Sequence, residues 1–323
     1  MSNNNNSNNN NNNKPLEFNR ETSKFRNWVR IGSDRFPPEA NRYHLYANYG
    51  CPWVNRVLIV RNLKGLQDVI SVSITEPRLY EREGWPFNPD FDEFTTDDAV
   101  NHAKNIPEIY RLSDATYQGR FSVPVLWDKK NSVIVNNESS EIIRMLNSEF
   151  NQFAKNPQLD LVPSDLQVEI DRINELVYEN VNNGVYKCGF SPSQEGYDIA
   201  FDKLFNTLDE LEERLDTNRY LVGDRFTEAD VRLFPTLIRF DAAYYVVFKC
   251  NLKRIQDYPN LFNYLKELYQ MPALQSTINF KHIKNGYFKS KPSLNPTLIV
   301  AKGPSTDVLL EPHNRDSKLP IKK

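Results

Sequence analysis

Apolar and polar positions divide the chain into a half with short alternating runs and a half with helical stripes. In the first half, the aromatic-rich run 42–48 alternates as a β-strand does, and segment 53–66 carries apolar residues at helical spacing. The run 68–74 indicates a second strand. Because a helix separates the two strands, we expect them to pair in parallel as a βαβ unit.

The rest of this half predicts a second βα pattern. After an irregular insertion with a helix over about 96–112, the β-branched runs 122–128 and 132–137 flank three turn residues, which indicates a hairpin. A helix should follow, with Asn137 as its N-cap and acidic residues in its first turn. The order β-α-β, insertion, β-β-α is typical of an α/β thioredoxin-like domain, which we place at residues 25–155.

The second half predicts an all-α domain at residues 164–290. Ser164 and Gln167 form a possible capping box before a stripe of apolar residues at helical spacing. Thr227 and Asp230 form another possible capping box before an apolar helix, and two further segments carry apolar residues at helical spacing. The architecture expected is therefore a thioredoxin-like domain followed by an all-α domain.

The two ends of the chain differ from these halves. Residues 2–13 contain only Ser and Asn, so we expect residues 1–24 to be a disordered Asn-rich tail. Residues 291–323 mix Pro, Gly and Lys around short apolar pairs, which predicts an ordered extension that fades into a tail.

The composition and net charge of the chain exclude some classes of partner. The 323 residues have a net charge of -2, with 39% hydrophobic and 25% charged residues, so neither nucleic acid nor an anionic membrane is an expected partner. No apolar run reaches membrane-spanning length. Three scattered cysteines cannot form a disulfide framework, which favours a reducing, cytoplasmic location.

Cys51 is the strongest candidate for chemistry. It lies between a predicted strand and helix, with Pro52 suited to the first helical position, and a helix N-terminus favours the thiolate. Val54 lies where a Cys-x-x-Cys motif has its second cysteine, so Cys51 can form a disulfide only with an outside thiol. The alternative is a buried structural cysteine, which is the interpretation we favour for Cys188 and Cys250.

Other motifs suggest how a ligand could bind. Val123-Pro124 is a candidate cis bond beside the cysteine, where a ligand peptide could pair. Glu138 and Ser139 at a helix start suit an α-amino and α-carboxylate pair, although ordinary capping explains them equally well. The four histidines are far apart and no metal site is expected.

Seven segments together resemble the Xi-class glutathione transferases, the S-glutathionyl-hydroquinone reductases. They are "FRNWVR", "RYHLYANYGCPWVNR", "SVPVLWDKKNSVIVNNESSEIIRML", "NNGVYKCGF", "TEADVRLF", "LIRFDAAYYVVFKCN" and "NPTLIV". The resemblance implies a homodimer with glutathione as co-substrate, no permanently bound cofactor, and a helical wall for an aromatic glutathione conjugate.

The resemblance also implies roles for individual residues. Cys51 matches the nucleophile and Tyr186 a proton donor or acceptor, whereas Tyr244 and Tyr287 match tyrosines that lower the pKa of the cysteine. The positions that match the glutathione site are Trp85, Arg120, Phe121, Ser122, Val123, Glu138 and Ser139. Five positions depart from the family pattern, and we expect them to affect the choice of co-substrate: Asn55, Val246, Val247, Gly286 and Phe288.

The function expected is reductive removal of glutathione from glutathionyl-hydroquinones through a Cys51–glutathione mixed disulfide. One alternative is an omega-like thioltransferase or dehydroascorbate reductase that uses the same cysteine. Another is a non-catalytic regulator on the same scaffold, with the Asn-rich tail driving assembly. Deleting residues 1–24 is expected to affect a regulator and to leave an enzyme active.

Overall fold

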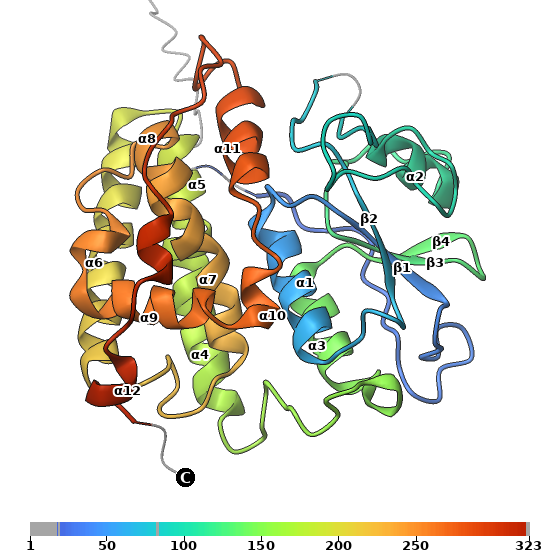
Figure 1. The fold of residues 1–323 in the computed structure, drawn as a ribbon. Coiled ribbons are helices and arrows are strands. Elements are labelled where there is room, and N and C mark those ends of the chain that lie inside the picture. Colours follow the sequence, from blue (N-terminus) through green and yellow to red (C-terminus); the bar gives the residue numbers. More distant parts are fainter. Residues whose placement is uncertain (1–17, 19, 82–83, 321–323) are drawn as a thin grey trace, which may run out of the picture.

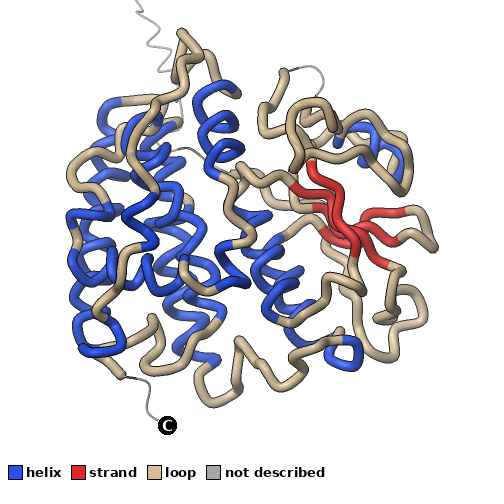
Figure 2. Tube along the Cα trace, in the orientation of Figure 1, coloured by secondary structure: helices blue, strands red, loops and turns tan. Residues whose placement is uncertain are grey.

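Two parts of different architecture lie side by side in the computed structural model, which describes residues 18, 20–81 and 84–320 (Figure 1). A small sheet with flanking helices forms one part, and a larger group of helices forms the other (Figure 2). Most of the Asn-rich tail, including residues 2–13, lies outside the described residues. No helix within the described ranges combines the length and the apolar character needed to cross a bilayer.

The sheet has four strands in the order β2-β1-β3-β4. β1 and β2 pair in parallel, whereas β1 with β3 and β3 with β4 are antiparallel, so the predicted βαβ unit and hairpin are confirmed. The Val123-Pro124 bond is cis, as predicted. The strands are β1 (Tyr43–Ala47), β2 (Ser71–Ile74), β3 (Val125–Asp128) and β4 (Val133–Asn136).

Helices cover both faces of the sheet. α1 (Pro52–Leu63) and α3 (Ser139–Ser148) lie on the face toward the helical part, and their apolar residues share one core with it. α2 (Ile106–Ser113) packs on the other face in a smaller core. Because these apolar residues form one continuous core, the sheet and the helical part are fixed relative to each other.

Two predicted helix starts in this part are wrong. The helix expected over 96–112 begins only at Ile106, because the Asn105 side chain caps it by accepting from the N–H of Glu108. The N-cap of α3 is Glu138 and not Asn137, since the Glu138 carboxylate accepts from the N–H of Ser140. The amide of Asn137 instead donates to the Tyr110 hydroxyl in the interior.

The helices of the second part occupy residues 167–289, within the predicted all-α segment. The Thr227–Asp230 capping box is present at the start of α7, as predicted. The Ser164–Gln167 box is absent, because α4 begins at Gln167 without a side-chain cap. The helices are α4 (Gln167–Val177), α5 (Gly184–Gly189), α6 (Gln194–Thr217), α7 (Glu228–Arg239), α8 (Tyr245–Val247), α9 (Pro259–Tyr269), α10 (Pro272–Gln275) and α11 (Phe280–Lys289).

Two π-helical turns interrupt this helical part. One spans Tyr178–Asn182 between α4 and α5, and the other spans Phe240–Tyr244 between α7 and α8. A π turn inserts an extra residue and so rotates the side chains that follow it, which is why such turns are frequent at functional sites. Here they precede Tyr186 and contain Tyr244.

The C-terminal extension is ordered along the helical part and ends near α12 (Arg315–Lys318), as Figure 1 shows in red. The guanidinium of Arg315 is fully buried and donates to the backbone carbonyls of Leu215, Asn218 and Arg219. These bonds satisfy carbonyls at the end of α6 and fix the extension to the fold.

Candidate active site

Cys51 is the N-cap of α1, at the turn that follows β1. Its backbone is extended, Pro52 occupies the first helical turn, and the Asn48 side chain holds the turn by accepting from the N–H of Gly50 at 2.8 Å. The Asn48 amide in turn donates to Thr75 and to the carbonyl of Glu76. The strand, turn and helix predicted around Cys51 are therefore all present.

The Cys51 thiol faces a cavity and donates to the carbonyl of Val123, with sulfur and oxygen 3.5 Å apart. Burial raises the pKa of this thiol above its ordinary value. The N–H groups of Trp53 and Val54 and the charges of Arg239 and Arg20 act in the opposite direction without offsetting the burial. The N–H groups at the start of α1 thus favour the thiolate, as expected, but burial outweighs them and the net pKa is raised.

Arg239, at the end of α7, holds the nucleophile turn from the helical side. Its guanidinium is fully buried, and it donates to the backbone carbonyls of Tyr49 (2.9 Å) and Gly50 (3.1 Å). It also donates to the Asn55 side chain at 2.9 Å. One cation from the second half of the chain therefore fixes both the turn and the first helical residues next to Cys51.

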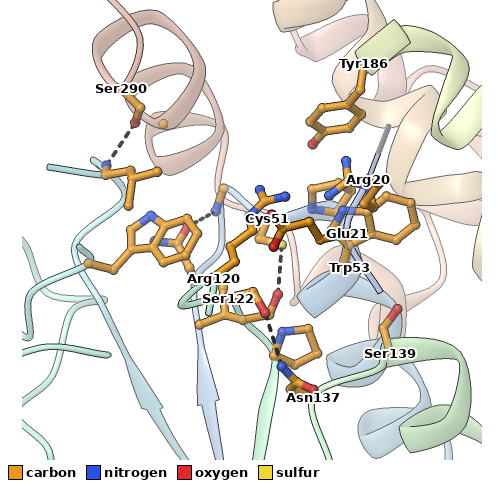
Figure 3. Close-up of a pocket in the computed structure, with 18 of the residues that line it drawn as sticks. Arg20, Glu21, Cys51, Trp53, Arg120, Ser122, Asn137, Ser139, Tyr186 and Ser290 are labelled. Carbon is orange, nitrogen blue, oxygen red and sulfur yellow. Dashed lines mark hydrogen bonds between the residues drawn. The ribbon is translucent and has the colours of Figure 1, made fainter. Parts of the chain in front are cut away.

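The cavity has a volume of about 460 Å³ and is lined by both halves of the chain (Figure 3). Nine of the predicted site residues line it, whereas Phe121 and Tyr244 do not. Phe121 packs against Tyr110 and Tyr117 instead. The nine residues are Cys51, Trp85, Arg120, Ser122, Val123, Glu138, Ser139, Tyr186 and Tyr287.

Three tyrosine hydroxyls form a chain on the helical side of the cavity. The Tyr287 hydroxyl lies 2.7 Å from that of Tyr186 and 2.8 Å from that of Tyr244, which is fully buried behind it. Burial raises the pKa of all three hydroxyls, so they are protonated at neutral pH. Such a chain can pass a proton toward the cavity. The described bonds of the Cys51 sulfur include none from a tyrosine, so a role of Tyr244 and Tyr287 in tuning its pKa stays a prediction.

The opposite end of the cavity is polar. Glu138 caps α3, and its second carboxylate oxygen accepts from the Ser23 hydroxyl at 3.1 Å. Ser139 lies in the first turn of the same helix, and the Ser122 hydroxyl lies 3.2 Å from that of Tyr110. A carboxylate, hydroxyls and helix N–H groups thus meet where an amino acid end group could bind.

Sequence reasoning missed the segment 18–24 as part of the site. Phe18 and residues 20–24 line the cavity. The Arg20 guanidinium carbon lies 4.8 Å from the ring centre of Trp53 and 4.6 Å from that of Tyr186. No apolar period marks this polar stretch, but the two basic residues between the two phenylalanines of "FNRETSKF" are a signal that could have been used.

Of the five departures from the family pattern, only Gly286 lines the cavity. A Cβ atom there would meet the carbonyl oxygen of Pro77 at 3.3 Å, so α11 approaches the Cys51 side closely. Asn55 is buried between Arg239 and Thr277, and Phe288 is buried in the core. Val246 is exposed, and its neighbour Val247 is buried.

The other two cysteines and the buried His282 lie in surroundings that indicate a structural role. Cys188 and Cys250 are buried and unpaired, as the structural interpretation predicted. The buried His282 contacts the carboxylate of Asp92 at 3.1 Å and ties α11 to the segment before α2. Among the described residues, no group of three or more His, Cys, Asp or Glu side chains could hold a metal ion.

Comparison with known proteins places the chain among glutathione transferases. The model of the glutathione S-transferase N-terminal domain matches residues 50–149, and that of the C-terminal domain matches residues 194–267. The glutathionyl-hydroquinone reductase PcpF of Sphingobium chlorophenolicum is 50% identical over 89% of this chain and 90% of that protein.

Two further comparisons include solved structures. The glutathionyl-hydroquinone reductase YqjG of Escherichia coli is 47% identical over 93% of this chain and 92% of its own length. Its glutathione-bound structure matches with a TM-score of 0.87 over 92% of this chain and 97% of that chain. The glutathione transferase Xi of Phanerochaete chrysosporium is 49% identical, with a TM-score of 0.86 over 90% of this chain and 98% of that chain. The expected thioredoxin-like and all-α architecture is therefore confirmed, and the chain belongs to the Xi class of the glutathione transferases, the family of the glutathionyl-hydroquinone reductases.

Proposed function

We propose that this protein is a glutathione-dependent reductase that removes glutathione from S-glutathionyl-hydroquinones. The Cys51 sulfur attacks the glutathione sulfur of the conjugate, the bond from that sulfur to the ring carbon breaks, and the hydroquinone leaves with a proton on that carbon. A Cys51–glutathione mixed disulfide remains. A second glutathione attacks this disulfide and leaves as oxidised glutathione.

The observation that carries this proposal is the position of the Cys51 thiol between two unlike ends of one cavity. One end has the polar groups of Glu138, Ser139 and Ser122, and the other has the rings of Trp53 and Tyr186. A glutathione conjugate of an aromatic ring has the same division into a polar peptide and an apolar ring. The names of the relatives PcpF and YqjG support the same substrate class.

Each predicted site residue has a proposed role in this cycle. We place the γ-glutamyl end of glutathione at Glu138 and Ser139 and the rest of its peptide against Trp85 and the segment 120–123. Tyr186 is the proton donor to the ring carbon, and Tyr287 and Tyr244 relay the proton behind it. Since burial raises the pKa of the Cys51 thiol, its proton has to leave first to give the attacking thiolate, and the proton gained by the ring carbon balances that loss.

We also propose which co-substrate the enzyme uses, where in the cell it lies and how it assembles. Glutathione is the co-substrate, which the glutathione-bound structure of YqjG supports. We propose that no cofactor stays bound, as the family resemblance implies. We propose a cytoplasmic homodimer, because the unpaired Cys51, Cys188 and Cys250 suit a reducing compartment and the family resemblance implies a dimer.

Turnover assays with three substrates test the proposal. The purified protein receives glutathione and either glutathionyl-menadione in its reduced form, a mixed disulfide of glutathione with 2-hydroxyethanethiol, or dehydroascorbate. We expect the conjugate to yield the free hydroquinone and oxidised glutathione in equal amounts, and a Cys51→Ser variant to lose this activity by orders of magnitude. Turnover of only the mixed disulfide or dehydroascorbate would instead support an omega-like enzyme.

A further inference from the structure

The Arg20 side chain lines the aromatic end of the cavity and contains a hydrogen-bond donor without a partner among the described residues. Its Nε donates to the Asn183 side chain at 2.9 Å, which fixes the guanidinium at the start of α5. Its Nη2 atom is buried from water and has no hydrogen-bond partner among the described residues. Because a buried N–H group without a partner is costly, such a group in a ligand cavity points to an acceptor on the ligand.

The rings around Arg20 show where this acceptor would lie. Its guanidinium carbon is within 5 Å of the ring centres of both Trp53 and Tyr186. Figure 3 shows the side chain between these two rings. A second guanidinium, that of Arg56, lies 4.5 Å from the Trp53 ring centre. An aromatic ligand that enters between Cys51 and Tyr186 therefore meets a cation at its edge.

The charge of Arg20 reaches the reacting groups. It lowers the pKa of Cys51 and that of Tyr186, although burial raises both overall. Arg20 is therefore close enough to act on negative charge that forms at either side chain. Both side chains line the same cavity as Arg20.

We propose that Arg20 is a catalytic residue that stabilises the negative charge on the ring oxygen of the departing hydroquinone, an inference that rests on the proposed function. In that reaction the sulfur-bearing ring carbon, next to a hydroxyl-bearing carbon, gains a proton as the ring hydroxyl becomes a ketone. The Cys51 thiolate then bonds to the glutathione sulfur. The electron pair of the broken sulfur–carbon bond enters the ring, and the ketone oxygen becomes an aryl oxide.

Negative charge thus moves from the Cys51 sulfur to a ring oxygen while the cysteine is oxidised to a disulfide and the ring is reduced. A fixed cation at the place where the charge arrives lowers the barrier to this step. A mixed disulfide with an aliphatic thiol has the same attack on sulfur but no ring oxygen. Arg20 therefore defines a substrate class: aromatic conjugates with an oxygen next to the sulfur-bearing carbon.

The test compares two donors of a glutathionyl group in single-turnover reactions with the full-length protein. Arg20→Met removes the charge and keeps the length, and Arg20→Lys restores a charge. Arg35→Met is the control, since Arg35 is exposed and stacks on Phe36 away from the cavity. We expect Arg20→Met to slow glutathionyl transfer from reduced glutathionyl-menadione to Cys51 by about 100-fold, with partial recovery in Arg20→Lys. Transfer from the mixed disulfide with 2-hydroxyethanethiol should slow by no more than about tenfold, because that reaction loses only the effect of the Arg20 charge on the pKa of Cys51.

The possible outcomes separate this role from the proposed function. An Arg20→Met variant that transfers from the conjugate as fast as wild type overturns the role of Arg20 and leaves the proposed function intact. An equal loss with both donors also overturns it, because a merely structural residue would produce that result. A wild-type protein that does not react with the conjugate overturns both.

Discussion

Replacing Arg239 with methionine should both destabilise the protein and slow the chemistry at Cys51. Its fully buried guanidinium donates to the carbonyls of Tyr49 and Gly50 and to the Asn55 side chain. Methionine has a similar length but no donor, so three acceptors at the nucleophile turn lose a partner. The fold then lacks the contact that joins α7 to this turn.

The magnitude follows from these bonds. A hydrogen bond from a charged donor contributes about 1.5–3 kcal/mol, so three bonds set an upper range of about 4.5–9 kcal/mol. The cost of burying the guanidinium in the wild type offsets part of this. We therefore expect the free energy of unfolding to fall by about 3–5 kcal/mol. The charge of Arg239 also lowers the pKa of Cys51, so its removal should raise that pKa further and reduce the thiolate fraction.

The assay combines denaturant unfolding with alkylation of Cys51 by iodoacetamide at fixed pH. Arg172→Met is the control, because Arg172 is exposed and pairs only with Glu169 among the described ion pairs; we expect it to behave as wild type. If Arg239→Met changed the unfolding free energy by less than about 0.5 kcal/mol and left the alkylation rate unchanged, Arg239 would not hold the nucleophile turn.

Three further predictions follow from the fold and the site. Alkylation of Cys51 should be slow at neutral pH and should accelerate as pH rises through a pKa above that of an ordinary cysteine, because burial favours the neutral thiol; a plateau below pH 7 would contradict this. Asp230→Ala should lower the free energy of unfolding by about 3 kcal/mol or more. The reason is that three donors would lose their acceptor: the N–H groups of Leu221 and Thr227 and the Tyr264 hydroxyl. Chemical denaturation measures this change, and a loss below about 1 kcal/mol would count against it. Deleting residues 1–17 should preserve turnover. Deleting residues 1–24 should reduce it, contrary to the expectation from the sequence alone, because Arg20 and the other cavity-lining residues up to residue 24 are then lost; equal turnover of the two truncated proteins would argue against a role for this segment.

Local patterns predicted the parts of the fold that depend on neighbouring residues. The turn at Cys51, the hairpin and the Thr227–Asp230 capping box each involve short sequence distances and familiar residue types. The helix over 96–112 was too long because Asn105 competes as a cap, which the apolar period does not reveal. The Ser164–Gln167 box failed because the N-cap of the helix is Leu166, two residues later than the box requires.

The parts of the site that could not be predicted depend on contacts between distant segments. The chain of hydroxyls joins Tyr186, Tyr244 and Tyr287 from three separate elements. Arg239 and Cys51 are far apart in the sequence, and the burial that raises the pKa of the thiol comes from the whole cavity. The resemblance placed most site residues in one cavity, but it indicated neither the segment with Arg20 nor the positions of Phe121 and Tyr244 outside the cavity lining.

Whether Cys51 accepts a glutathionyl group from an aromatic conjugate can be read from the mass of the protein. The wild type and a Cys51→Ser variant are each mixed with reduced glutathionyl-menadione in the absence of free thiol, and the intact and digested proteins are weighed. We expect a gain of one glutathionyl group on the peptide that contains Cys51, equal release of the free hydroquinone, and no gain in the variant. An unmodified wild-type protein, or a glutathionyl group on Cys188 or Cys250 instead, would contradict it.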